Sequence, residues 1–211
     1  MVDSTLGTHT IDQALLLFGR PKSVTGFFRT LRGVDSEIDD TFTIILQYDG
    51  AQKNLLVTIK TTIITPMQDQ LKYFFRGTKG SFVKASLVHC AVIRILTPLQ
   101  HGEDPQAEQT MGSGMSATDP RYGFEDERTY GLLATTDEFD GKVQKYDERS
   151  KLYVGRYPSM QGHYLGYYEN LVDTIHGQKS IAVNSEDSRD GLRVIELARE
   201  SHEKGVAVQW S

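Results

Sequence analysis

The sequence of 211 residues contains a single cysteine, Cys90, so one chain cannot form an internal disulfide. It also lacks the charged N-terminal segment and following apolar run that mark a secretory signal peptide. A lone thiol without a leader is typical of proteins from a reducing compartment. These two absences predict a cytoplasmic protein.

An excess of basic residues is missing as well. Lys and Arg number 23 against 28 Asp and Glu, which gives a formal net charge of −5 at pH 7, and no stretch gathers the cations into a stripe. The longest apolar stretch, residues 85–100, is too short for a membrane-spanning helix and is interrupted by Arg94 and Pro98. The sequence therefore predicts partners other than nucleic acid and membranes.

Three kinds of cofactor or catalytic motif are absent. Neither Gly-x-Gly-x-x-Gly nor Gly-x-x-x-x-Gly-Lys-Ser/Thr follows a predicted strand, and the βαβ alternation of a dinucleotide-binding fold does not occur. The six histidines include no pair at i+4 spacing, and one cysteine cannot build a structural zinc site. A Gly-x-Ser-x-Gly elbow is also missing. We expect no metal, no nucleotide and no serine or cysteine hydrolase chemistry.

A helix is predicted close to the N-terminus, with Gly19 as its stop signal. Its apolar residues recur at helical spacing and would form one buried stripe: Ile11, Ala14, Leu15 and Phe18. His9 and Asp12 lie three residues apart and share a different face, where a side chain can reach into a cleft. This histidine is either a solvated helix-start residue or part of a site.

Strands dominate the middle of the chain. Runs rich in Val, Ile, Thr and Phe, bounded by turn residues, lie at residues 22–32, 39–50, 53–65 and 71–84. Asp49-Gly50 predicts a hairpin between the second and third runs, and the fourth run would turn near Gly77–Gly80. Residues 142–158 could add edge structure.

Two further helices are predicted in the last third, over residues 160–177 and from a Ser185 N-cap to Lys204-Gly205. Helices at both ends and antiparallel strands between them favour a single α+β domain over residues 1–211. Its architecture would be an open, mainly antiparallel β-sheet with the helices packed on one face.

Five segments, taken in order, resemble the C-terminal half of Gfo/Idh/MocA-type oxidoreductases: LGTHTIDQALLLFGRPKSV, GTKGSFVK, GEDPQAEQ, YGLL and GHYLGYYENLVDTI. Complete members of that family join an N-terminal Rossmann domain, which binds NAD(P), to a C-terminal α+β domain that contacts the substrate. The resemblance implies that this chain alone binds no cofactor. It also implies a small, sugar-like substrate and a homo-oligomer, such as a dimer, formed through the open sheet.

The resemblance assigns roles to the first helix. The family motif there is Asp-x-Gly-x-His followed by Asp three residues on, and Gly7, His9 and Asp12 match it, whereas Thr5 replaces its first aspartate. By this resemblance His9 is the catalytic acid/base that removes a substrate hydroxyl proton. Asp12 would orient it or cap the helix. The catalytic lysine of the family's Rossmann domain has no counterpart in this sequence.

Substrate contacts are predicted farther along the chain. His163 and Tyr164 stand beside the family's Gly-x-Tyr pattern, although Tyr164, Tyr167 and Tyr168 also fit the apolar face of an amphipathic helix. Lys72 and Arg76 lie on a predicted strand and would face either a substrate groove or solvent.

Two stretches depart from the family pattern. Residues 85–100 form an apolar insert, and residues 101–127 form a long polar loop that is functional or mobile. The insert is interpreted as a retained intron read through in frame, and the start at Met1 as a product of the same error in the assignment of exons. Alternatively, the insert covers surface exposed by loss of the Rossmann partner.

The sequence thus predicts a substrate-binding domain that is redox-silent on its own. The alternatives are a cofactor-independent isomerase, cyclase or lyase that uses His9 and a tyrosine, and a non-catalytic oligomerisation scaffold.

Overall fold

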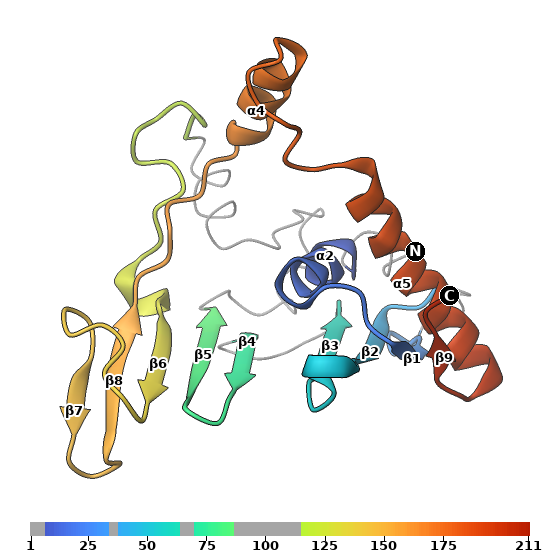
Figure 1. The fold of residues 1–211 in the computed structure, drawn as a ribbon, viewed down its shortest axis with the longest axis horizontal. Coiled ribbons are helices and arrows are strands. Elements are labelled where there is room, and N and C mark those ends of the chain that lie inside the picture. Colours follow the sequence, from blue (N-terminus) through green and yellow to red (C-terminus); the bar gives the residue numbers. More distant parts are fainter. Residues whose placement is uncertain (1–6, 34–37, 64–69, 87–114) are drawn as a thin grey trace. The chain divides into compact units, whose positions relative to one another are not determined.

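A computed structural model describes residues 7–33, 38–63, 70–86 and 115–211 (Figure 1). The chain divides into two compact units, one formed by Met1–Ile64 and Asn170–Ser211 and the other by Thr65–Glu169. Each unit has its own open, antiparallel sheet, so the predicted α+β class with open sheets is confirmed. The strands form two sheets where one was predicted. Most of the apolar insert and the first part of the predicted long loop lie outside the described residues.

The first unit contains a four-stranded sheet in the order β3-β2-β1-β9. Its strands are β1 (Ser23–Arg29), β2 (Thr41–Gln47), β3 (Leu56–Thr62) and β9 (Val208–Gln209). The predicted hairpin between β2 and β3 is confirmed, and Gly50 in its turn has a φ of +56°, which favours glycine. At the opposite side of the sheet, Val24 pairs with Val208, and the Trp210 N–H donates to the Lys22 carbonyl at 2.8 Å.

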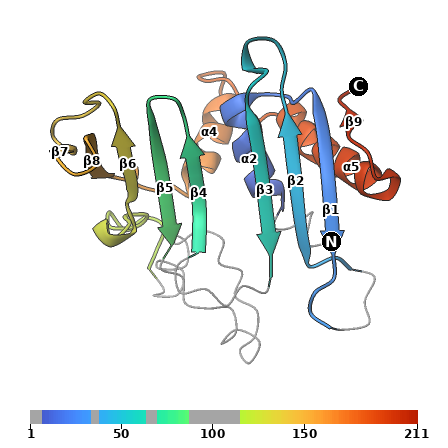
Figure 2. The same ribbon diagram turned by 90° about the horizontal axis from the view of Figure 1, so that it is seen from below.

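Two helices, α2 (Gly7–Phe18) and α5 (Ser185–Lys204), cover one face of this sheet (Figure 2). Alternate strand residues point toward them and are buried with helix residues: Val24, Phe28, Phe42, Ile44, Leu46 and Ile59 with Ile11, Ala14, Val194, Leu197 and Ala198. The predicted apolar stripe of α2 and its end at Gly19, with a φ of +74°, are confirmed. The cap of α5 is Asn184, not Ser185, because its side chain accepts the Asp187 N–H.

The helix α5 approaches β1 very closely at Gly26. A Cβ atom at this position would lie 2.1 Å from the carbonyl oxygen of Ala198, in the backbone of the helix. The Ser201 hydroxyl accepts the Gly26 N–H at 3.1 Å and donates to the Val206 carbonyl at 2.6 Å. Glycine is therefore required by space at this point, since a side chain would separate helix and strand.

A buried carboxylate organises the connection between β1 and β2. Asp40 is fully buried and accepts hydrogen bonds from the backbone N–H groups of Leu31 and Arg32, from the Arg32 guanidinium and from the Thr41 hydroxyl. Burial alone would raise the pKa of Asp40, but these donors outweigh it and hold the pKa below its usual value. The chain reversal after β1 thus depends on an ionised Asp40.

We expect Asp40→Asn to lower the free energy of unfolding by about 1.5–3 kcal/mol at pH 7, because the amide replaces an anionic acceptor with a donor facing N–H groups. A folded-state pKa below the unfolded value means that Asp40 stabilises the protein above about pH 4 and loses this effect as pH falls through the folded pKa. Urea unfolding measures this effect: the difference in free energy of unfolding between wild type and Asp40→Asn should be largest at pH 7 and should decrease at acid pH.

The matched control is Asp39→Asn. Asp39 is partly exposed and pairs with Arg199 at 3.2 Å, so its loss should cost under about 1 kcal/mol. If the difference in free energy of unfolding between wild type and Asp40→Asn stays constant or increases as the pH falls, the role assigned to the Asp40 charge is wrong.

The second unit contains a five-stranded sheet in the order β4-β5-β6-β8-β7. Its strands are β4 (Gln70–Arg76), β5 (Gly80–Ser86), β6 (Gly131–Thr135), β7 (Lys145–Asp147) and β8 (Leu152–Tyr157), and a 3-10 turn, η3 (Glu127–Thr129), precedes β6. The predicted β4–β5 hairpin is confirmed, with the Gly77 N–H donating to the Gly80 carbonyl. The predicted edge structure is β7, whereas β8 lies inside the sheet.

The helix α4 (Gly166–Ile175) follows β8 along the chain. It begins after Tyr164, and none of its residues is buried. The interpretation of Tyr164, Tyr167 and Tyr168 as amphipathic core is therefore wrong, since all three are exposed. In the described part of the chain, no helix is both long and apolar enough to cross a membrane.

Candidate functional site

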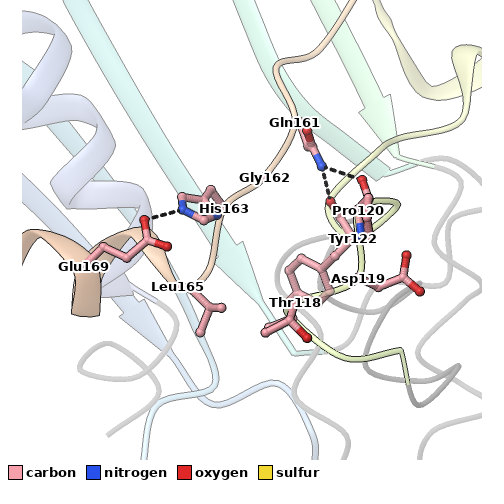
Figure 3. A pocket seen from close by; sticks show the side chains of 10 residues that line it. Thr118, Asp119, Pro120, Tyr122, Gln161, Gly162, His163, Leu165 and Glu169 are labelled. Atoms are coloured by element: carbon pink, nitrogen blue, oxygen red, sulfur yellow. Dashed lines mark hydrogen bonds and ion pairs between the residues drawn. The ribbon is translucent and has the colours of Figure 1, made fainter.

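A pocket of about 350 Å³ lies within the second unit (Figure 3). Two segments form its walls, one ahead of β6 and the other between β8 and the first turn of α4. We call them the front wall, residues 117–122, and the back wall, residues 161–169. The lining side chains and backbone are those of Ala117, Thr118, Asp119, Pro120, Tyr122, Gln161, Gly162, His163, Leu165 and Glu169.

The walls are joined to each other by hydrogen bonds to main-chain atoms. Gln161 Nε2 donates to the carbonyls of Pro120 at 3.1 Å and Tyr122 at 2.8 Å (Figure 3). The Gly162 N–H donates to the Gly123 carbonyl at 2.8 Å. Gly123 has a φ of +80°, and a Cβ there would lie 2.0 Å from the Gly162 carbonyl oxygen. The close approach of the two walls therefore needs glycine at position 123.

His163 and Glu169 form an ion-pair contact in the back wall. The Nε2 atom of His163 lies 2.7 Å from Oε2 of Glu169, which belongs to the first turn of α4. The two side chains are 59% and 61% exposed, so solvent and ligands can reach them. The carboxylate fixes the orientation of the imidazole, whose other nitrogen can exchange a hydrogen bond or a proton with a ligand.

Asp119 forms a two-point ion pair with Arg121 in the front wall. Its two carboxylate oxygens accept hydrogen bonds from Arg121 Nε at 3.0 Å and Nη2 at 2.8 Å. The side-chain hydrogen bonds from Arg121 lower the pKa of Asp119 to about 2. The carboxylates of both walls can accept hydrogen bonds from the O–H groups of a ligand.

A buried cluster, which the sequence did not predict, lies beside the walls. Lys84 on β5 is only 8% exposed, and its Nζ lies 2.5 Å from Glu125 Oε2 and 2.7 Å from Ser159 Oγ. The Ser159 hydroxyl in turn donates to the same Glu125 oxygen at 2.5 Å. The cluster could have been found from strand alternation, because Lys84 occupies the same face of β5 as Phe82, where an apolar residue is expected.

The structure places the predicted site residues in different units. His9 and Asp12 lie on α2 in the first unit, and both are exposed on the side away from Ile11 and Ala14. Of the predicted substrate-binding residues, His163 lines the pocket, whereas Tyr164 is 62% exposed and lies outside the lining.

The two predicted strand cations also lie outside this pocket. Lys72 is the bulge residue of β4, and its ammonium group lies 5.9 Å from the centre of the Tyr73 ring. The Arg76 guanidinium lies 5.4 Å from the ring of Phe74. Both cations therefore pack against aromatic rings of their own strand.

The described residues do not fit a dinucleotide cofactor. All strand pairs in the two sheets are antiparallel, so within these ranges the parallel βαβ unit that cradles a pyrophosphate does not form. The same residues contain no group of three His, Cys, Asp or Glu side chains that could hold a metal ion.

Comparison with known families gives a match over residues 4–83 to the GFO/IDH/MocA C-terminal domain. This segment of the chain thus matches the C-terminal domain of the Gfo/Idh/MocA family. The match spans α2 and the strands β1 to β4 and reaches into β5, so it contains Gly7, His9 and Asp12. This match confirms the resemblance drawn from the sequence.

Two curated relatives match nearly the whole chain but only part of their own length. The scyllo-inositol 2-dehydrogenase (NADP(+)) IolW of Bacillus subtilis is 30% identical over 93% of this chain and 45% of its own length. The uncharacterized oxidoreductase C115.03 of Schizosaccharomyces pombe is 29% identical over 97% of this chain and 50% of its own. The chain spans about half the length of these relatives.

A solved structure from Bacteroides fragilis has the same fold. It superimposes with a TM-score of 0.77 at 27% identity, over 99% of this chain and 53% of its own. The likeness extends over both units, whereas the family match ends within β5. The segments of both units, including those that form the pocket, are therefore shared with this solved structure.

Proposed function

We propose that this chain is the substrate-binding and proton-transfer part of an NAD(P)-dependent oxidoreductase that acts on a CH–OH group. The observation that carries the proposal is the placement of His9 and Asp12 within the family-matched segment, on the exposed side of α2. The single cysteine supports a cytoplasmic site of action.

In this proposal His9 accepts the proton of a substrate hydroxyl when the adjoining carbon is oxidised. An imidazole suits the step because histidine is the side chain that most often serves as a general acid or base in enzymes. Asp12, one turn along the same exposed face, would orient the ring or stabilise its protonated form.

The chain alone is proposed to be redox-silent. Hydride transfer needs a nicotinamide held against the substrate carbon, and the antiparallel sheets of the described residues supply no dinucleotide cradle.

The substrate class proposed is a sugar-like polyol. The inositol dehydrogenase relative supports this, as do the hydroxyl-accepting carboxylates of Asp119 and Glu169 and the imidazole of His163 in the pocket. Tyr164, Lys72 and Arg76 remain predicted substrate contacts.

Thermal unfolding of the full chain with scyllo-inositol, and separately with NADPH, tests the proposal. We expect the polyol to raise the melting temperature, since a ligand at 100 times its dissociation constant contributes about 2.7 kcal/mol. NADPH should neither shift the transition nor be consumed when inosose is added. His9→Ala and His163→Ala should each weaken polyol binding by up to about tenfold through loss of one hydrogen bond.

The matched control is His176→Ala, which removes an exposed histidine outside the pocket and should leave polyol binding unchanged. Consumption of NADPH would overturn the redox-silent part of the proposal. Absence of any polyol shift would overturn the substrate class. Conversion of the polyol without nucleotide would instead indicate the isomerase or lyase alternative.

A second candidate function is a homo-oligomerisation scaffold, which the outer sheet faces favour. In the first unit Phe27 and Leu56 are exposed on the face opposite the helices, and in the second unit Leu71, Phe74 and Leu132 are exposed. Exposed apolar side chains on open sheets favour subunit packing. Light scattering that shows a dimer, together with normal assembly of His9→Ala, would support this function.

A further inference from the structure

Lys84 connects both walls of the pocket to the sheet of the second unit. Its partner Glu125 follows the front wall by three residues, and its other partner Ser159 precedes the back wall by two. Lys84 itself lies in β5, between β4 and β6. One ammonium group thus bonds at the same time to the two chain segments whose continuation forms the pocket.

The chemistry of the cluster indicates a fixed contact and not a nucleophile. Ser159 has one hydroxyl proton, and this proton goes to Glu125 Oε2, while Lys84 donates to both oxygen atoms. An ammonium that already donates to the serine oxygen cannot act as a base toward it. With Glu125 only 3% exposed, the ion pair is shielded from water, which strengthens its hold on the geometry.

The bonds between the walls depend on this anchoring. Gln161 bonds to the front wall, and Gly162 bonds to Gly123 next to it. These bonds join one wall to the other and not to the sheet. The Lys84 cluster is where the joined walls are fastened to a central strand by side chains. Without it, each wall could shift relative to the sheet and to the other wall, so the bonds between the walls would weaken and the pocket would lose its shape.

We propose that Lys84 is a positioning residue that sets the geometry of the pocket through Glu125 and Ser159. It touches no ligand in this role and acts on the orientation of His163 and Asp119 through the segments that carry them. The nature of the ligand rests on the proposed function, but the positioning role does not.

Hydrogen exchange of the full chain tests this role with two variants. Lys84→Met/Glu125→Leu removes both charges together, so that no unpaired buried charge remains, and Ser159→Ala removes only one hydrogen bond. The Gly162 amide, which bonds to the Gly123 carbonyl, should exchange about tenfold faster in the double variant and a few-fold faster in Ser159→Ala. Amides in β6 and β8 should change less than about twofold.

The control is Lys79→Met/Asp137→Leu, which removes an exposed ion pair of the same unit, 3.9 Å long, and should leave Gly162 exchange unchanged. Unchanged exchange at Gly162 in Lys84→Met/Glu125→Leu, or an equal acceleration throughout the sheet, would overturn the proposal.

Scyllo-inositol binding, measured by thermal shift, is a second readout. Loss of binding in the folded double variant is the expected result. If wild type also fails to bind the polyol while Gly162 exchange responds as expected, the substrate class fails and the positioning role stands.

Discussion

Lys84→Met should lower the free energy of unfolding of the second unit by about 3–5 kcal/mol, the usual cost of breaking a buried ion pair by removing one partner. The methionine fills similar space but leaves the Glu125 carboxylate with Ser159 as its remaining partner in the cluster. Urea-dependent hydrogen exchange of amides in β6 and β8 would measure the loss in this unit directly.

Two comparisons separate the buried pair from a general effect of losing a lysine. Lys79→Met removes a side chain that is 85% exposed, so we expect a loss below about 1 kcal/mol. Lys84→Met/Glu125→Leu should recover nearly all of the stability lost in the single variant, because both charges are absent. A loss below about 1 kcal/mol in Lys84→Met would show that water reaches the cluster and stabilises the carboxylate.

Gly26→Ala should destabilise the first unit by about 3 kcal/mol, at the upper end for overpacking, because the added methyl meets backbone atoms that cannot rotate away. It would lie 2.1 Å from the Ala198 carbonyl oxygen and 2.8 Å from the Ala198 Cα. Moving α5 outward to relieve this contact would also break the bond from the Gly26 N–H to Ser201. The single tryptophan, Trp210, packs against this core, so its fluorescence in urea would report the change.

Gly191→Ala is the matched control for this prediction. Gly191 lies in α5 and is also buried, but nothing surrounds the place of its Cβ within 4 Å. Alanine there should be neutral or stabilise the helix by up to about 1 kcal/mol, because it restricts the unfolded chain. Equal losses in the two variants would show that glycine loss, and not the close approach at Gly26, is the cause.

Much of the fold could be predicted because it depends on local patterns. Alternation of apolar residues located β2 and β3, Asp49-Gly50 located the turn between them, and Gly19 marked the end of α2. The division into two sheets could not be predicted, because strand pairing across long loops leaves no periodic trace. The exposure of α4 could not be predicted either, because its tyrosines have the helical spacing of an apolar face, yet they are exposed.

The site was less predictable than the fold. His163 was identified from the family pattern, and it does line the pocket. Lys84 was not predicted to be a site residue, because a lysine on a strand is ordinarily solvated. Its partners Glu125 and Ser159 are 41 and 75 residues away, so the ion pair exists only once the chain has folded.

The last strand has a consequence for how this protein is handled. Although β9 is only two residues long, Gln209 and Val208 occupy the outer hydrogen-bonding positions of Ser23 and Val24 on β1, and Trp210 occupies that of Lys22. Trimming the tail before Val208 would offer β1 as a template to a strand of another molecule, the first step toward a fibril. An affinity tag or fluorescent fusion should accordingly leave Val208, Gln209 and Trp210 in place.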